Sequence, residues 1–298
     1  MIPLSKELES TGIGYNITGQ NKRIHHLLYM DDLKLFAKDD KGLDRLLQIT
    51  KSFSSDICME FGLNKCAKVR FHRGKLATSE NMNSETFQRV KSLDASETYK
   101  YLGFEECLGT NNRTVKERLE KVYIKRLRSA LDNELCAKFK IETINTIAVP
   151  VLRYSFGIVN WSKYEMQALD RKTRKLLRKF NLHHPAADID RLYVSRLEGG
   201  RGLIQLESLL KSSVIATANY LKSDSGDPLK QMLADWDRNQ APSLSLQRKA
   251  EQFQQELYRI SEDVENTTVG RSDIREILKK PKVNPGKRNL CMANTREK

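Results

Sequence analysis

The chain has 298 residues, of which 30% are charged, and its formal net charge at neutral pH is +14. This length predicts two or three domains with buried cores, and the positive charge favours polyanionic partners such as nucleic acid. The five scattered cysteines form no Cys-x-x-Cys pair, which argues against a disulfide framework and a zinc knuckle. No signal peptide and no run of 18 apolar residues occurs, which argues against a membrane partner. We therefore expect a reducing compartment, the nucleus or the cytoplasm.

The first pronounced pattern is a predicted β-hairpin. Short apolar runs at residues 24–28 and 33–37 flank the tetrapeptide Tyr29-Met30-Asp31-Asp32. Adjacent carboxylates repel each other by on the order of 1 kcal/mol or more unless a cation binds there. Mg²⁺ takes oxygen ligands from one or two carboxylates together with substrate phosphates. The pair therefore suggests a Mg²⁺ site with Asp31 as ligand and Asp32 as its supporting neighbour, although an ordinary turn without metal also accounts for it.

Further elements of the first domain follow in order. Apolar residues at helical spacing predict a helix over residues 43–60 that stops at Gly62. We expect one small antiparallel sheet, backed by this helix, formed by strands at Gly14–Thr18, His26–Met30, Leu33–Ala37, Ala67–Phe71 and Tyr99–Phe104.

A basic helical region comes next. Residues 111–180 contain 17 Lys and Arg against seven Asp and Glu. Two helices there combine an apolar stripe with a basic face, which carries Arg118, Lys121, Lys125 and Arg128 in the first helix and Lys172, Lys175 and Lys179 in the last. Such faces bind nucleic-acid phosphates without reading sequence, and a solvated face of a soluble helix is the simpler alternative.

The rest of the chain carries weaker signals. The spacing predicts a helix over residues 204–221 and a stripe at residues 246–260 that docks on preceding helices. Residues 199–202 fit a turn that needs positive φ better than a phosphate loop, and His183-His184 does not make a good metal pair. The basic segment 279–288 is expected to be disordered; a nuclear-import signal remains an alternative for it.

Three motifs in this order resemble the reverse transcriptases of non-LTR retrotransposons. They are Tyr29-Met30-Asp31-Asp32 on a hairpin, Gly62-Leu63-Asn64-Lys65 after a helix, and Tyr99-Lys100-Tyr101-Leu102-Gly103. Residues 150–157, 183–185 and 199–203 look like the region after the thumb in the same family. The resemblance covers roughly residues 1–210, and it implies an RNA-directed DNA polymerase that uses Mg²⁺.

The resemblance also assigns roles to individual residues. Asp31 and Asp32 would be catalytic metal ligands, and Lys65, with Lys68 as a rival, would help to protonate the leaving pyrophosphate. Residues that would contact the primer are Tyr29, Met30, Tyr99, Lys100, Tyr101, Leu102 and Gly103. The implied organisation is α+β: a partial palm at 1–109, a thumb-like basic helical bundle at 110–182, a helical post-thumb region at 183–264 and a basic tail at 265–298.

One catalytic part of the family is missing from the pattern. A two-metal polymerase needs another aspartate from a separate strand, so that both ions, about 3.5–4 Å apart, are held between carboxylates. In the family, that aspartate and the fingers precede the hairpin by many more residues than precede it in this sequence. We therefore expect a palm-and-thumb fragment that is inactive alone and contacts RNA template and DNA primer through phosphates. The alternative is a non-enzymatic protein that binds RNA or an RNA–DNA hybrid through its basic helices.

Overall fold

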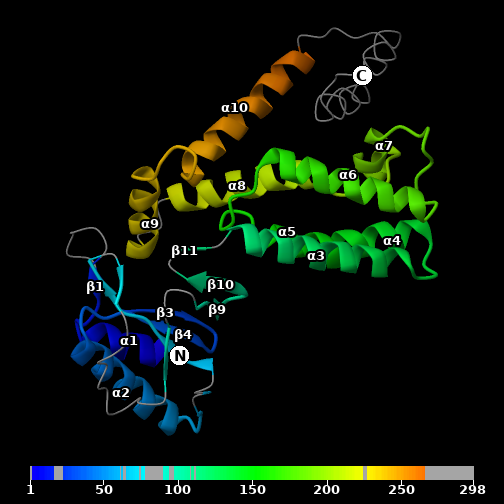
Figure 1. Cartoon of the computed structure of the whole chain (residues 1–298). Coiled ribbons are helices and arrows are strands. Elements are labelled where there is room, and N and C mark those ends of the chain that lie inside the picture. Colours follow the sequence, from blue (N-terminus) through cyan, green and yellow to red (C-terminus); the bar gives the residue numbers. More distant parts are fainter. Residues whose placement is uncertain are drawn as a thin grey trace. The chain divides into compact units, whose positions relative to one another are not determined.

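The chain divides into two compact units, Met1–Asn111 with Ser225–Leu233, and Asn112–Asp224 with Ala234–Lys298. The computed structural model (Figure 1) describes residues 2–16, 23–60, 62, 65–73, 75–77, 90–93, 97–107, 109–110, 112–223 and 227–265. The predicted basic tail at 265–298 therefore falls outside the described residues except for Glu265, the last residue of the final helix. Small sheets in the first unit and helices in the second confirm the α+β class. The four-part division stays a prediction.

Two helices and a hairpin form the core of the first unit. Helices α1 (Ile2–Ser10) and α2 (Asp40–Asp56) pack side by side, as Figure 1 shows. Leu4, Leu8 and Leu46 are almost fully buried between them, and Leu33 and Leu35 of the hairpin pack against this cluster. The Asp39 side chain caps α2 by accepting a hydrogen bond from the Gly42 N–H, 2.7 Å away.

The predicted single antiparallel sheet is wrong, because the strands in the described part of the chain pair in five separate sheets. The antiparallel pairs are β1 (Tyr15–Asn16) with β2 (Arg23–Ile24), β3 (His26–Tyr29) with β4 (Asp32–Leu35), β6 (Phe71–His72) with β7 (Lys75–Leu76), and β9 (Tyr99–Tyr101) with β10 (Phe104–Cys107) and β11 (Gly109–Thr110). Strands β5 (Ala67–Lys68) and β8 (Lys91–Ser92) pair in parallel. Alternating polarity predicts where strands lie but not which strands pair.

Helix α2 ends earlier than predicted. We expected it to continue to Glu60 and to stop at Gly62, but its last residue is Asp56. Cys58 has φ of 56°, and the N–H groups of Cys58 and Met59 bond to the carbonyls of Ser55 and Ser54. This is a Schellman motif in which Cys58 takes the left-handed position that glycine usually occupies.

The second unit is a bundle of helices. They are α3 (Asn112–Leu131), α4 (Ala137–Thr143), a π-helical turn (Ile144–Ala148), α5 (Val149–Arg153), α6 (Lys163–Lys179), α7 (Asp190–Tyr193), a 3₁₀ turn (Arg196–Glu198), α8 (Leu206–Lys222), α9 (Pro228–Arg238, shared with the first unit) and α10 (Leu246–Glu265). Helix α3 packs against α5 and α6, and α8 packs against α6 and α10. The predicted docking of α10 on preceding helices is confirmed by its contact with α8.

Proline 150 lies within the helical path without ending it. Proline has no N–H to donate, and the turn before it widens to a π-helix in which the Val149 N–H bonds to the Ile144 carbonyl. Asn145 lies in this wide turn. Its amide group donates to the Gly202 carbonyl (2.7 Å) and accepts from the Ile204 N–H (3.0 Å). Asn145 of the π-turn thereby fixes the segment that leads into α8.

Residues 199–202 form the predicted turn, after the short helix α7 and the 3₁₀ turn. Gly199 and Gly202 both have positive φ, and a Cβ on Gly200 would lie 1.9 Å from the Val194 carbonyl oxygen. His183 is buried whereas His184 is exposed and accepts a hydrogen bond from the Ala186 N–H. The two imidazoles therefore face different surroundings, which agrees with the expectation that they do not form a metal pair.

Candidate active site on two hairpins

Asp31 lies at the tip of a tight hairpin, and Asp32 is the first residue of the strand β4 that follows. Residue Tyr29 pairs with Asp32, so only Met30 and Asp31 form the loop. Met30 has φ of 55°, and Asp31 is not among the residues with positive φ, which is the pattern of a type II′ turn. Glycine is preferred at the first position of that turn, so a methionine there is strained by on the order of 1 kcal/mol. Strain of this kind clusters at functional sites.

Strand alternation gives the hairpin two different faces. Leu28, Leu33 and Leu35 share one face, and Leu33 and Leu35 join the core between α1 and α2. Tyr29, Asp32 and Lys34 share the opposite face because successive side chains alternate. Burial of the leucines thus holds the Asp32 face outward. Both aspartates are exposed to solvent.

A second hairpin carries the predicted primer-contacting tyrosines. Tyr101 pairs with Phe104, which leaves Leu102 and Gly103 as a two-residue loop with positive φ at both positions. This is a type I′ turn, in which Gly103 meets the requirement without strain. Tyr99 and Tyr101 share one face of the strand, and Lys100 is exposed on the other. The predicted single strand at Tyr99–Phe104 is wrong, because this turn divides the range into β9 and the first residue of β10.

Lys34 joins the two hairpins. Its ammonium group donates to the Glu106 carboxylate at 2.5 Å and lies 4.9 Å from the centroid of the Tyr101 ring. Each contact contributes modestly at this degree of exposure, together about 1 kcal/mol. Their geometric effect is larger, because they bring the face of the first hairpin that carries Asp32 to the face of the second that carries Tyr99 and Tyr101.

The pKa values of Tyr99 and Tyr101 reflect this proximity. Burial raises the pKa of Tyr99 and of Tyr101, and the charges of Asp32 and Glu106 raise both further, because a negative charge disfavours the phenolate. Asp31 does not contribute to either shift. The site therefore comprises an outward aspartate at the tip, a second aspartate facing two tyrosines, and one lysine that contacts Glu106 and the Tyr101 ring.

Removing the charge of Asp32 should lower both tyrosine pKa values. We expect Asp32→Asn to shift the tyrosinate titrations of Tyr99 and Tyr101 toward the ordinary value, and Asp31→Asn to leave them unchanged. Titration by NMR of protein labelled with ¹³C at tyrosine Cζ resolves the individual residues. Equal shifts in the two variants would show that Asp32 does not face the second hairpin as described.

Lys65 does not join this group among the described contacts. It is exposed, and its recorded bond is from its backbone N–H to the Gly62 carbonyl, 2.7 Å. The adjacent Cys66 is nearer to the second hairpin, since its charge when ionised contributes to the raised pKa of Tyr99. Burial in turn raises the pKa of the Cys66 thiol, so it stays protonated at neutral pH. The proposed role of Lys65 is untested.

The donor set fits part of a magnesium site. Asp31 and Asp32 present adjacent, exposed carboxylates, and hard divalent ions prefer such oxygen ligands. Among the residues that the structure describes, no group of three or more His, Cys, Asp and Glu side chains is arranged to hold a metal ion. The two aspartates would therefore bind Mg²⁺ only with further ligands, such as water, phosphate or another carboxylate.

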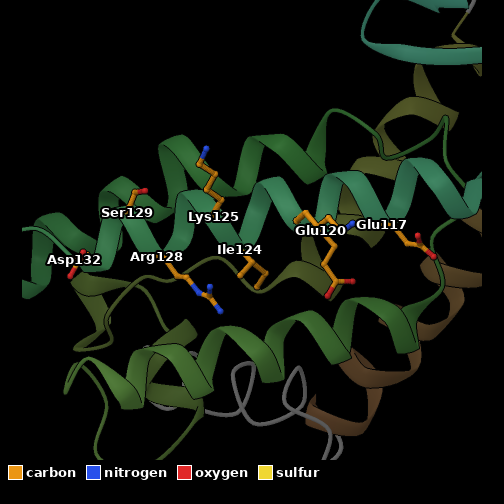
Figure 2. Close-up of a pocket in the computed structure, with 8 residues that line it drawn as sticks. Glu117, Glu120, Ile124, Lys125, Arg128, Ser129 and Asp132 are labelled. Atoms are coloured by element: carbon orange, nitrogen blue, oxygen red, sulfur yellow. The ribbon is translucent and has the colours of Figure 1, made fainter.

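The basic residues of α3 line a groove of about 630 Å³ (Figure 2). Lys121, Lys125 and Arg128 contribute positive charge, but the carboxylates of the same groove, Glu117, Glu120 and Asp132, balance it. In Figure 2, Arg128 projects on the side of Ile124, and Lys125 projects on the other side of the helix. Arg118 is half-buried and outside the groove lining. The α3 groove is thus less suited to phosphate than its lysines alone suggested.

The basic face of α6 differs from residue to residue. Lys172 forms an ion pair with Glu120 of α3, so it holds the two helices together. Lys175 and Lys179 are exposed, as are Arg171 and Arg178, and none of the four forms an ion pair with a residue in the described part of the chain. This cationic face of α6, defined by Arg171, Lys175, Arg178 and Lys179, is the surface most open to phosphate.

Sequence reasoning missed Lys34 and Glu106. A signal for Lys34 was present, because it lies two residues after Asp32 in a strand and so shares its face. Nothing local indicated Glu106, which is 72 positions away from Lys34.

The chain matches no protein-family model, and its similarity to curated proteins does not reach significance. Within the described residues no helix has the length and apolarity needed to cross a membrane.

Proposed function

We propose that this chain is part of an RNA-directed DNA polymerase of the non-LTR retrotransposon type, comprising one half of its palm followed by its thumb. The observation that carries the proposal is the hairpin with Asp31 and Asp32, held outward by the partly buried Leu33 and Leu35 and joined through Lys34 to a hairpin with two tyrosines. A polymerase needs carboxylates on a rigid support beside a surface that holds the primer end.

Each residue has a defined part in this proposal. Asp31 and Asp32 hold Mg²⁺, which supplies stabilisation of the charge that develops on the reacting phosphate. Tyr29 and Met30, at 57% and 73% exposure, are available to contact the primer end. Tyr99 and Tyr101 extend the same surface, and Lys34 holds the two hairpins together. An aspartate from outside the described residues completes the ligand set.

Metal binding and synthesis test the proposal separately. Mn²⁺ should broaden the NMR signals of Leu28 and Leu33 in the isolated chain, and Asp31→Asn should remove the effect, whereas Asp56→Asn, at the exposed end of α2, should not. In primer extension with Mg²⁺ or Mn²⁺ on an RNA template, we expect no synthesis by the chain alone. Synthesis should appear when it is fused behind the fingers and first palm strand of a non-LTR enzyme, and Asp31→Asn should lower it by about 100-fold or more. Template-dependent synthesis by the isolated chain would contradict the proposal that it contains only one half of a palm.

A second function, binding of RNA or an RNA–DNA hybrid without catalysis, is favoured by the cationic face of α6. Its Lys175 and Lys179 are free of ion pairs within the described residues, whereas Lys172 already pairs with Glu120. Each phosphate contact that is lost should reduce the dependence of log affinity on log salt by about one. We therefore expect Lys175→Met and Lys179→Met each to reduce this slope, and the matched variant Lys172→Met to reduce it less. If the affinity for the RNA–DNA hybrid does not change with salt concentration, this second function is contradicted.

A further inference from the structure

His26 of β3 connects the first hairpin to helix α1. Its Nε2 atom lies 2.7 Å from the hydroxyl oxygen of Ser5, which is 21 positions earlier in the chain. His26 is directly opposite Leu35 in the hairpin, so its ring lies on the face that packs against the core between α1 and α2. The bond between Ser5 and His26 is therefore a polar contact within the apolar interface of α1 and the hairpin.

The other ring nitrogen of His26 has no partner. Nδ1 is buried, and it forms no hydrogen bond with any residue that the structure describes. A neutral imidazole is compatible with this arrangement, because it carries a single N–H, which can be directed at Ser5. A protonated imidazole carries an N–H on both nitrogens, so one of them would be buried without an acceptor. The interface thus accommodates the neutral ring and disfavours the charged one.

Two titratable groups act on His26. Glu9 of α1 favours the charged ring, and His25, the preceding residue, disfavours it, whereas no charged group of α2 contributes among the described residues. Leu35, across the hairpin, is apolar. Burial has the largest effect and lowers the pKa of His26 below its ordinary value of 6.5, against the effect of Glu9. The charges around the ring therefore do not compensate for its burial.

We propose that protonation of His26 releases α1 from the β3–β4 hairpin, so that the first unit contains a pH-sensitive contact. After release, water accepts the hydrogen bond from Nδ1–H. Helix α1 has nine residues, which is too short to remain helical without packing. The hairpin that carries Asp31 and Asp32 thereby loses the packing of α1 against its leucines. This contact does not depend on whether the chain belongs to a polymerase.

The direction of the effect follows from proton uptake. The pKa of His26 is lower with α1 docked than with α1 released, so the released state binds the proton more readily. Docking is therefore strongest above the ordinary pKa of 6.5 and weakens as the pH falls below it.

Hydrogen–deuterium exchange of the full chain at about pH 7.5 and about pH 5 tests the proposal, with protection factors corrected for the intrinsic effect of pH. The amides of Glu7, Leu8 and Glu9 in α1 should lose protection by on the order of tenfold at the lower pH, as expected for one buried N–H without an acceptor. Amides in the middle of α2 should lose less. Unchanged protection of α1 would overturn the proposal. Equal losses in α1 and α2 would also overturn it, because the unit would then unfold as a whole.

Two variants assign the effect to one ring. His26→Gln cannot take up a proton but keeps a polar group for Ser5, so the protection of α1 should no longer depend on pH. His72→Gln, at an exposed position of β6 in the same unit, should keep the full dependence. If His26→Gln fails to fold, NMR titration of the His26 ring in the unmodified chain decides, since its midpoint must coincide with the loss of protection in α1. An unaltered dependence in His26→Gln, or two different midpoints, would contradict the role of His26.

Discussion

Replacing Lys211 with methionine is expected to lower the free energy of unfolding of the helical unit by about 3 kcal/mol. Lys211 lies between α8 and α10, with its side chain 8% exposed, and forms ion pairs with Glu207 at 2.9 Å and Glu256 at 3.1 Å. These two carboxylates raise its pKa against the effect of burial. Methionine would fill the same space but leave two carboxylates without their cation, which costs more than the pairing itself contributed.

An ion pair on the same two helices provides the control. Lys222 pairs with Glu251 at 2.9 Å, but both side chains are about half exposed. Lys222→Met should therefore lower stability by less than about 1 kcal/mol. Urea denaturation followed by the fluorescence of Trp161, which is buried in the same unit, measures both variants. Equal losses of stability in the two variants would mean that Lys211, Glu207 and Glu256 are solvated rather than buried.

The second large effect is a dependence of stability on pH that arises from Asp170 of α6. Its carboxylate accepts from the N–H groups of Leu206 (3.1 Å) and Glu207 (3.4 Å), so it caps the start of α8 from another helix. Burial raises the pKa of Asp170 to about 6, although the two N–H donors and Arg174 act in the opposite direction and Glu207 reinforces the rise. Tyr193, whose phenol accepts from Arg174, completes the charged surroundings.

The direction of the effect follows from proton uptake. Between about pH 4 and pH 6 the folded chain keeps the proton on Asp170 while the unfolded chain has lost it, so stability falls as pH rises through this range. The full loss is about 3 kcal/mol. Asp170→Asn cannot ionise and lacks this component. We therefore expect the difference in unfolding free energy between the wild type and Asp170→Asn to fall by about 3 kcal/mol from pH 4 to pH 7.

Asp235→Asn, at a half-exposed position of α9 that pairs with Arg238, should show no comparable change. If the difference between the wild type and Asp170→Asn stays constant from pH 4 to pH 7, Asp170 is not buried in the folded chain. The same Trp161 fluorescence applies to this series, because Asp170 and Trp161 belong to the same unit.

Asp170 was within reach of sequence reasoning. It lies on the apolar stripe of α6 with Met166, Leu169, Thr173 and Leu177, all of them buried. A carboxylate on a core-facing stripe indicates a buried polar contact, since few charged residues are buried without partners. Its partners, however, are backbone groups 36 and 37 positions away. The pattern of α6 alone does not identify them.

The hairpin with Asp31 and Asp32 was determined by the sequence, because its information is local. Short apolar runs predict both strands, and a two-residue loop fixes their register within ten positions. The helical bundle followed in the same way from apolar spacing along each helix. In these elements the pattern that predicts the structure lies in residues that are close together in the sequence.

Only the tertiary structure decided which strands pair, which basic side chains remain open and what lies beside Asp32. Lys172 and Lys175 occupy similar positions in the sequence pattern, yet one is bound to Glu120 and the other is free of ion pairs among the described residues. Lys34 contacts Tyr101 and Glu106 across a long stretch of chain. Periodicity specifies the face on which a side chain lies, whereas its partner on another element depends on how the buried faces pack together.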